Sequence, residues 1–386
     1  MPDLAAHVIE MSRSGIREIM DLAAERENVV HLEVGQPDFP TPQHIVEAAV
    51  AAARGGFHGY TPNKGLPELR EAVAETYRLP LGPDQVVVTC GAVNALLEAL
   101  MVVVDPGDAV LVPEPGWPNY RMMATLVHAR QIGYPVDLRG SGEPDLEVLD
   151  AVIAGTERAK VLVLNSPNNP TGAVYSRETV EGLIRLCERH DLFLLSDECY
   201  DRVVFDREHV RPADLDDSGR VVTVTSVSKS YAMTGWRIGF LLAPDGQFAD
   251  LAAKVQETVV ACASAVAQKA AEAALLGDQS PVTEMVDAYR RRRDVAAKQL
   301  EQHNLALMHP KGAFYAMADI SGATRDSYAF ARRAVVEHGV AVAPGETFGH
   351  AGAGAVRLSL AAPEAEIGEG IARLAEAVTS WPGGLG

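Results

Sequence analysis

The stretch over residues 222–239 constrains the fold of this chain more than any other. It opens with alternating β-branched residues, the pattern of a short strand. The pattern then breaks at Ser226, Ser228 and Lys229, and the segment continues to Arg237. A lysine just past the end of a buried strand is an unusual place for a solvated charge. Together with the neighbouring hydroxyls and the arginine, it predicts a bound anion.

A lysine amine held beside a phosphate is the arrangement that a pyridoxal-phosphate Schiff base requires. A surface turn would be the simpler interpretation of an isolated Ser-x-Ser-Lys. Six positions match at fixed spacing here, namely Ser226, Ser228, Lys229, Gly235, Arg237 and Gly239. At about one chance in ten to twenty per position, coincidence is a poor explanation. We therefore interpret the segment as a functional motif.

With these residues, the segment resembles the lysine region of fold-type I pyridoxal-phosphate-dependent enzymes, specifically the class I/II aminotransferases of the prokaryotic type. The resemblance extends from Gly-Gln-Pro-Asp-Phe at 35–39 to Val-Arg-Leu-Ser-Leu at 356–360. It implies an α/β fold in which helices flank a mostly parallel central sheet, with a smaller α/β domain formed by both chain ends. It also implies a homodimer.

The length of the chain and the order of its elements indicate two domains. A chain of 386 residues is too long for one ordinary hydrophobic core. Buried, parallel-type strands give way to short mixed strands toward the C-terminus. We expect a large cofactor-binding domain over 41–285 and a small domain over 286–386, with residues 1–40 packing against the small domain. A helix is predicted over 4–27.

Composition and charge exclude several classes of function. A net charge of −18 argues against nucleic acid and against an anionic membrane as partners. The four cysteines and eleven histidines lack metal-ligand spacing, so we predict no metal site. The chain shows no signal peptide and no apolar run of the roughly 18 residues that a membrane span needs. Scattered reduced thiols fit a cytoplasmic enzyme.

The basic run over 290–293 lies in a segment with the pattern of a long charged helix. Because the chain as a whole is acidic, we interpret the run as a solvated helix face and not as a nucleic-acid site. The tail from Trp381 onward, rich in glycine and proline, is predicted to be frayed.

A strand that runs through Gly91 into a helix is the first of the segments that we expect to hold the cofactor. Such a junction directs free backbone N–H groups at an anion, so Gly91, Ala92 and Val93 form a candidate phosphate cradle. The turn is common in α/β proteins, and only the Ser/Lys/Arg cluster favours phosphate here. The resemblance further implies that Trp117 stacks on the pyridine ring and that Tyr60 reaches the phosphate of the other subunit. Ordinary packed loop residues are the alternative for both.

Asp197 ends an apolar strand, where an isolated carboxylate is costly unless a cation pairs with it. The pyridinium nitrogen of the cofactor would supply that cation, and a helix cap is the alternative role. Asn169 is the second asparagine written in the string Asn-x-Pro-x-Asn-Pro-Thr-Gly over 165–172. The resemblance places Asn169 at the phenolic oxygen of the cofactor. Tyr200 is expected to donate to the same oxygen. Lys229, Asp197 and Tyr200 are thus the expected catalytic residues.

Arg357 lies in the middle of a strand in the predicted small domain. A structural ion pair is the usual role of such an arginine. The resemblance instead makes Arg357 the fork for the substrate α-carboxylate, a role that suits its planar donors. Gly35, whose backbone can approach a ligand closely, and Asn169 are the other residues expected at the substrate.

The activity that the resemblance implies is transfer of an amino group from an L-amino acid to a 2-oxo acid by a ping-pong mechanism. Aspartate-preferring relatives carry a lysine where this chain has Val93, so we expect a neutral, hydrophobic or aromatic donor. Arg13, Arg17 and Lys64 remain as sources of a distal cation. Aspartate aminotransferase and a β-lyase or related eliminating enzyme are the alternatives. A non-catalytic cofactor sensor fused to a DNA-binding module is disfavoured, because the chain is acidic and shows no extra N-terminal domain.

Overall fold

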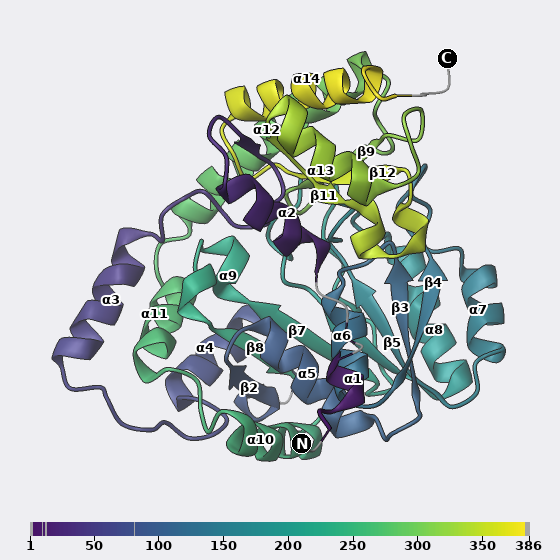
Figure 1. Ribbon diagram of the computed structural model, residues 1–386. Helices are drawn as coiled ribbons and strands as arrows, with labels where there is room; N and C mark the ends of the chain where they lie inside the picture. The colour runs from purple at the N-terminus through teal and green to yellow at the C-terminus, as the bar shows by residue number, and fades with distance from the viewer. Residues whose placement is uncertain (1–2, 10, 12–13, 81, 383–386) are drawn as a thin grey trace.

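The computed structural model describes residues 3–9, 11, 14–80 and 82–382 (Figure 1). Within these residues, one large sheet with its helices forms the lower part of the view, and a smaller group of short strands and helices forms the upper part. No helix in the described ranges is long and apolar enough to cross a membrane. No group of three or more His, Cys, Asp or Glu side chains in these ranges is arranged to hold a metal ion.

The large sheet has seven strands in the order β2-β8-β7-β6-β5-β3-β4. All neighbouring pairs are parallel except the two that β8 makes with β2 and β7. The sheet is therefore mostly parallel, which confirms the expected fold class. The strands are β2 (Val86–Thr89), β3 (Ala109–Glu114), β4 (Arg130–Pro135), β5 (Ala159–Asn165), β6 (Phe193–Asp197), β7 (Val221–Ser226) and β8 (Gly239–Leu242).

Helices cover both faces of this sheet, which is why its central strands read as continuous apolar runs. One core lies between the sheet and α5 and α10, another joins it to α7 and α8, and a third is built with α3, α4 and α11. These helices are α3 (Gln43–Arg54), α4 (Pro67–Tyr77), α5 (Ala92–Val103), α7 (Leu146–Ala154), α8 (Arg177–His190), α10 (Gly246–Val259) and α11 (Ala265–Leu276). The shorter α6 (Asn119–Leu126) and α9 (Val227–Ser230) follow β3 and β7.

The upper part is built on a three-stranded antiparallel sheet in the order β11-β12-β9. Its elements are β9 (Tyr315–Asp319), α13 (Ser327–His338), β10 (Val340–Ala341), β11 (Ala343–Pro344), β12 (Ala355–Ser359) and α14 (Glu364–Thr379). The N-terminal elements α2 (Gly15–Ala24) and β1 (Val30–His31) join it: β1 pairs with β10, and Ile19 of α2 lies in the same core as α14. The domain boundaries after residues 40 and 285 remain a prediction.

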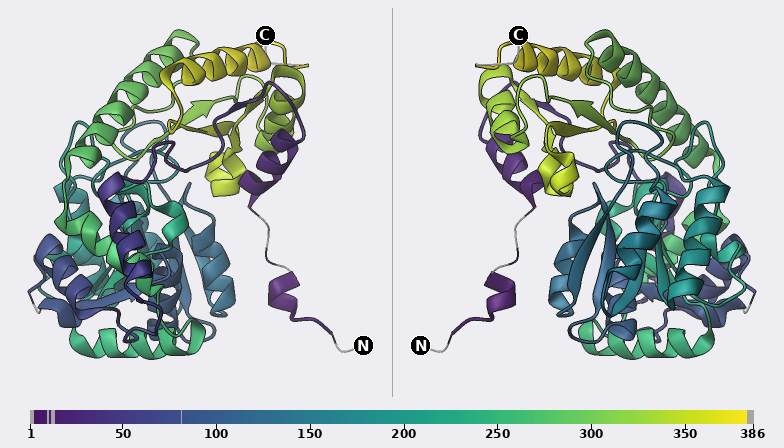
Figure 2. Two further views of the ribbon diagram at one scale, coloured as in Figure 1. Left: turned by 90° about the vertical axis from the view of Figure 1, so that its left-hand side faces the viewer. Right: turned by 90° about the vertical axis from the view of Figure 1, so that its right-hand side faces the viewer.

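The longest helix, α12 (Ser280–Gln302), connects the two parts (Figure 2). Its first turns place Val282 in the core of the large sheet, and its later turns place Tyr289 and Leu300 in the core of the upper part. Two of the four arginines over 290–293 are buried, since Arg292 is 8% exposed and Arg293 only 3%. The interpretation of this run as a solvated face is therefore wrong for these two residues.

Two further expectations about the chain ends are wrong. The helix predicted over 4–27 is not continuous, because α1 (Ala6–Ile9) and α2 are separate and Ser14 has extended backbone angles before α2. The second is wrong for Trp381, whose ring lies 5.6 Å from that of Phe330 and 5.2 Å from the guanidinium of Arg333, and residues 383–386 of the predicted tail lie outside the described residues. The periodicity of residues 4–27 does not reveal the interruption of the helix, and the composition of the tail does not reveal the contacts of Trp381.

Candidate active site

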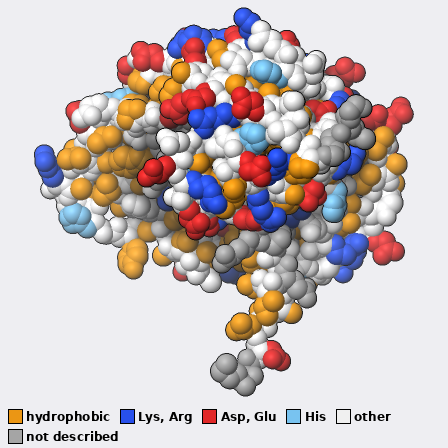
Figure 3. Space-filling model, turned by 45° about the horizontal axis from the view of Figure 1, so that its top comes forward, with side chains coloured by type: hydrophobic (Ala, Val, Ile, Leu, Met, Phe, Trp, Pro, Cys, Tyr) orange, Lys and Arg blue, Asp and Glu red, His pale blue; other side chains and the backbone are white. Residues whose placement is uncertain are grey.

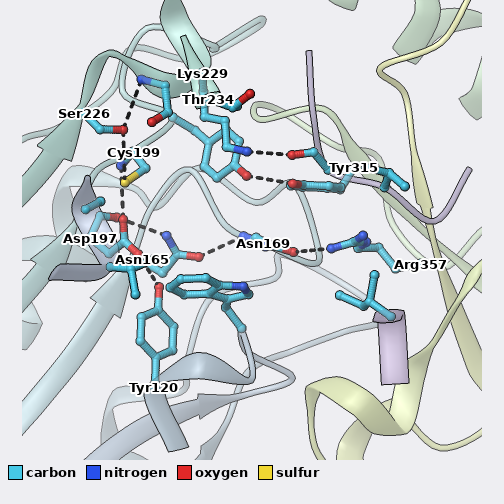
Figure 4. A pocket seen from close by; sticks show the side chains of 18 of the residues that line it. Tyr120, Asn165, Asn169, Asp197, Cys199, Ser226, Lys229, Thr234, Tyr315 and Arg357 are labelled. Carbon is cyan, nitrogen blue, oxygen red and sulfur yellow. Dashed lines mark hydrogen bonds between the residues drawn. The ribbon is translucent and has the colours of Figure 1, made fainter. Parts of the chain in front are cut away.

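A cavity lies where the carboxyl ends of the large sheet meet the upper part (Figure 4). Three adjacent strands end at it: β5 with Asn165, β6 with Asp197 and β7 with Ser226. Open α/β sheets place ligands at this edge. The remaining lining residues come from the helices α2, α5, α6 and α9, from the segment after β1, and from loops and strands of both parts.

Lys229 projects from the one-turn helix α9 directly after β7. Its Nζ donates a hydrogen bond of 2.6 Å to the backbone carbonyl of Gly35. Burial, together with the positive charges of Arg357 and Arg237, lowers the pKa of Lys229 to about 8, against opposing effects of Cys199 and Asp197. Near neutral pH the unprotonated share of this amine is therefore far larger than that of an ordinary lysine, while the protonated form still predominates.

The carboxylate of Asp197 is buried and held by neutral donors. The Tyr120 hydroxyl donates to one oxygen at 2.6 Å, and the backbone N–H of Cys199 donates to the other at 3.2 Å. Burial raises the pKa of Asp197, and these two hydrogen bonds lower it. No ion pair joins Asp197 to a basic side chain among the residues that the structure describes. The carboxylate can thus receive a cationic group from a ligand.

Arg357 on β12 presents a buried guanidinium, 1% exposed, from the opposite side of the cavity. Its Nη1 donates to Oδ1 of Asn169 at 3.0 Å, and its Nη2 donates to the Glu33 carbonyl. The guanidinium also stacks on Tyr315, 4.4 Å from the ring centroid. Burial lowers the pKa of Arg357. Its Nε has no partner and no carboxylate pairs with it within the described ranges, so the position suits an anionic ligand.

The residues predicted to form a phosphate cradle lie at the start of α5. Gly91 caps this helix with a φ of +85°, and a Cβ on it would lie 2.3 Å from Nη2 of Arg237. Glycine is therefore required for the arginine to approach the helix N-terminus. Arg237 also donates to the Thr234 carbonyl at 2.8 Å, and Ser226 caps α9 by accepting from the Ser228 N–H. Cation, hydroxyls and helix N-terminus thus lie at one end of the cavity.

The aromatic candidates differ in where they lie. Trp117 lines the cavity and packs edge-on against Tyr120, with centroids 5.4 Å apart. Tyr200 also lines it, and its hydroxyl lies 2.7 Å from that of Tyr315. Tyr60 is 92% exposed and does not reach the cavity of its own chain. The other candidates that line it are Gly35, Ala92, Val93, Asn169, Ser226, Ser228, Lys229, Arg237 and Arg357.

Comparison with known proteins now decides the family. A family model described as aminotransferase class I and II matches residues 27–374. This chain belongs to that family. It is 38% identical to the probable aspartate aminotransferase of Methanocaldococcus jannaschii over 363 residues, which cover 92% of this chain and 94% of the relative. Its activity class, the transfer of amino groups, follows.

Solved structures agree with this assignment. The aspartate aminotransferase of Thermus thermophilus with maleate matches with a TM-score of 0.93 at 36% identity, covering 98% of this chain and 100% of that chain. An aromatic aminotransferase from Pyrococcus horikoshii matches with a TM-score of 0.87 at 34% identity, covering 94% and 98%. The fold of this aminotransferase is thus of fold type I, as its lysine motif predicted.

Several cavity residues of this aminotransferase were missed from sequence. Asn165 and Cys199 flank strand ends already singled out, and Tyr120 follows Trp117 by three residues, so position alone could have indicated them. Tyr315 lies within an apolar strand and carries no local signal. Ile16, Met20, Val34 and Thr234 also line the cavity.

The unusual environment of Lys229 can be tested directly. We expect its amine to titrate near pH 8, whereas an ordinary lysine titrates near 10.4. The rate at which an amine-reactive reagent modifies Lys229 in ligand-free protein, followed by peptide mass spectrometry across pH, measures this. Exposed lysines in the same digest provide the internal reference. A midpoint for Lys229 near that of the reference lysines would contradict the effect of burial.

Proposed function

We propose that this aminotransferase uses pyridoxal phosphate, held covalently by Lys229, to transfer an amino group from an L-amino acid to a 2-oxo acid by a ping-pong mechanism. The observation that carries the proposal is the arrangement of charges in the cavity. A lysine of lowered pKa is present with two buried charged groups, Asp197 and Arg357, that have no ionic partner among the described residues. Such a site suits a ligand with both cationic and anionic groups.

The residues present fit pyridoxal phosphate, and we assign them as follows. Asp197 would pair with the ring nitrogen, because its carboxylate is oriented by Tyr120 and Cys199 yet lacks a cation. Trp117 would stack on the ring. Tyr200 and Asn169 would bind the phenolic oxygen. The phosphate would be held by Ser226, Ser228, Arg237 and the backbone N–H groups of Ala92 and Val93, whereas the Gly91 N–H already donates to the Thr89 carbonyl at 2.8 Å.

When bound, the cofactor supplies an electron sink that allows an amino acid to lose its Cα proton. Lys229 carries that proton, because its lowered pKa makes the neutral amine easier to form near physiological pH than it is for an ordinary lysine. Arg357 binds the substrate α-carboxylate through its free Nε and its outward donors, and Gly35 and Asn169 lie beside it. The amino acid is thereby oriented toward Lys229 before the proton moves.

The lining of the cavity favours a neutral, hydrophobic or aromatic amino donor. Val93, Ile16, Met20 and Val34 give it an apolar side. Its basic residues, within the described ranges, are Lys229, Arg237 and Arg357, and each already has an assigned role. A second substrate carboxylate would be buried without a cation, which costs several kcal/mol.

The three other cations considered from sequence do not supply a distal partner in this chain. Lys64 pairs with Asp250 at 2.6 Å, and Arg17 lines a separate depression beside α13. Arg13 lies outside the described residues. The names of several relatives, aspartate aminotransferases at 34–38% identity, favour aspartate as the second candidate donor.

We further propose a homodimer in which Tyr60 of one subunit completes the phosphate site of the other. The loop that carries Tyr60 is anchored, since Gln268 donates to Thr61 at 2.9 Å and Gly65 packs against Val88. Tyr60 itself projects into solvent, as expected for a residue with a partner on another chain. The preceding helix α3 and its neighbour α11 expose apolar side chains at the left edge of Figure 3. A cytoplasmic location is proposed because all four cysteines are free thiols.

Replacement of the lysine tests the proposed cofactor chemistry. Lys229→Ala should abolish transamination while the protein stays folded, because both the covalent attachment and the proton carrier are lost. The measurements are turnover and the visible absorbance of the protein mixed with pyridoxal phosphate, with circular dichroism as the control for folding. An unchanged absorbance band in the variant would show that another residue holds the cofactor.

The substrate proposal predicts a higher kcat/KM for leucine or phenylalanine than for aspartate. The physical reason is the apolar lining around Val93 and the missing distal cation. A panel of donors, read as single half-reactions by absorbance, separates transamination from elimination, because only elimination releases ammonia and a 2-oxo acid without a second substrate. Val93→Lys should raise the aspartate rate specifically. A parent enzyme that prefers aspartate would overturn the proposed preference and leave the aminotransferase activity intact.

The dimer predicts complementation between two defective chains. In a mixed dimer of Lys229→Ala and Tyr60→Ala, one site contains Lys229 of one chain and Tyr60 of its partner, so activity should exceed that of either variant alone. Co-expression with two affinity tags and sequential purification isolates the mixed dimer. Dimers of Tyr60→Ala alone provide the baseline. A monomer in sedimentation at micromolar concentration would rule the arrangement out.

A further inference from the structure

Residues 34–40 belong to no helix or strand, and the first two of them, Val34 and Gly35, line the cavity. They make no backbone-to-backbone hydrogen bond with any other residue that the structure describes. Pro37 and Pro40 lack an N–H, so the sequence itself limits such bonds. The Gly35 carbonyl, which accepts the 2.6 Å hydrogen bond from Lys229, is part of this segment. Side-chain contacts must therefore determine where that carbonyl lies.

The segment is attached at both ends. Before it, the N–H of Leu32 donates to the Ala341 carbonyl at 2.9 Å. After it, the Thr41 hydroxyl donates to the carbonyl of Ala232 at 2.7 Å, and the indole N–H of Trp236 donates to that hydroxyl at 3.1 Å. These attachments fix the ends in the upper part and in the lysine loop, and they leave the residues between them to other contacts.

Arg292 of α12 supplies the strongest contact in the middle of the segment. Its Nη1 and Nη2 donate to the two oxygens of Asp38, both at 2.8 Å. The guanidinium also lies over the ring of Phe39, 4.8 Å from the centroid, and over that of Tyr289 at 5.5 Å. Phe39 and Tyr289 meet edge to face, with ring centroids 5.5 Å apart. The planar guanidinium donates two hydrogen bonds to one carboxylate and stacks on aromatic rings at the same time, which the ammonium group of a lysine cannot do.

We propose that Arg292 and Asp38 form a positioning pair that fixes the segment over 35–39, so that the Gly35 carbonyl holds the Lys229 amine at one defined point while it carries the substrate proton. The pair lies partly buried, with the arginine side chain 9% and the aspartate side chain 28% exposed. Water therefore screens it little on the arginine side. The proposal rests on the proposed role of Lys229.

The geometry gives the reason why a small displacement matters. Gly35 packs directly against Tyr315, since a Cβ on Gly35 would lie 2.1 Å from the hydroxyl oxygen of Tyr315. Tyr315 in turn touches the Tyr200 hydroxyl and stacks under Arg357. A shift of the segment would thus displace the Gly35 carbonyl that accepts from Lys229. It would also displace the Tyr315 ring on which Arg357, the proposed binder of the substrate α-carboxylate, stacks. Misplacement of a reacting group by about 1 Å can cost up to about a hundredfold in rate.

The neighbouring Arg293 offers a matched control on the same helix. It is as buried as Arg292, and it pairs with Asp206 at 2.6 Å and donates to the Pro310 carbonyl at 2.7 Å. Its guanidinium lies over Phe205, 4.9 Å from the centroid. None of these partners belongs to the segment over 35–39. Loss of the Arg293 contacts tests general damage to α12 and leaves the positioning pair intact.

The test compares Arg292→Lys and Asp38→Asn with Arg293→Lys in the cofactor-loaded enzyme. We expect both changes in the pair to lower kcat about tenfold with little change in KM, and to raise the kinetic isotope effect of Cα-deuterated substrate, because proton transfer becomes slower relative to the other steps. Amide hydrogen exchange in the peptide containing residues 34–39 should accelerate in both the loaded and the cofactor-free protein. Arg293→Lys should match the parent in all of these measurements.

Two outcomes overturn the proposal. Faster exchange with an unchanged isotope effect means that the pair is structural only. Equal effects of Arg293→Lys mean that α12 as a whole matters. If Arg292→Lys fails to fold, Asp38→Asn at its more exposed position decides the question alone. Failure of the proposed function is distinguishable, because then the parent enzyme itself would attach no cofactor at Lys229.

Discussion

The in-register ends of β5, β6 and β7 are the constraint on which the rest of the structure depends. Asn165 lies opposite Asp197 in the ladder between β5 and β6, and Asp197 lies opposite Val224 of β7. β7 therefore extends two residues further and delivers Ser226 and Lys229 beside the carboxylate. Because parallel strands share one carboxyl edge, a single sheet brings together an amide, a carboxylate and an amine. The helices and the upper part then enclose this edge.

The cavity keeps opposite buried charges apart, and this separation makes it chemically useful. Asp197 is held by Tyr120 and by a backbone N–H, and Arg357 by Asn169 and a backbone carbonyl. Neutral partners orient a charged group without neutralising it. A direct ion pair would satisfy both groups and leave no site for a ligand. Burying two charges without ionic partners lowers the stability of the folded protein. A ligand with complementary charges removes this free-energy cost, which favours its binding.

The parts of this architecture that sequence predicted are those written in local patterns. The apolar strands that end in Asp197 and in the Ser-x-Ser-Lys turn are continuous stretches of the sequence. The mostly parallel sheet and the residues around its edge could therefore be predicted. Arg292 could not be distinguished from its neighbours in a basic run, because its partner Asp38 lies 254 residues away. Tyr315 looked like core for the same reason, since its hydroxyl meets Tyr200 across 115 residues. The roles assigned to these residues remain proposals.

The N-terminal stretch over residues 15–40 contributes both to the lining of the cavity and to the hydrogen bonding of Lys229. Its helix α2 contributes Ile16 and Met20 to the apolar side of the cavity, and the segment that follows β1 contributes Val34 and the Gly35 carbonyl. The same stretch thus forms part of the surface that we propose contacts the substrate side chain, and it also provides the acceptor for the Lys229 amine. Between α2 and the segment over 34–40 lies β1, which backbone hydrogen bonds hold against β10. With the segment itself held by Arg292 and Asp38 as we propose, the substrate side of the cavity can vary while the acceptor of the Lys229 amine stays in place.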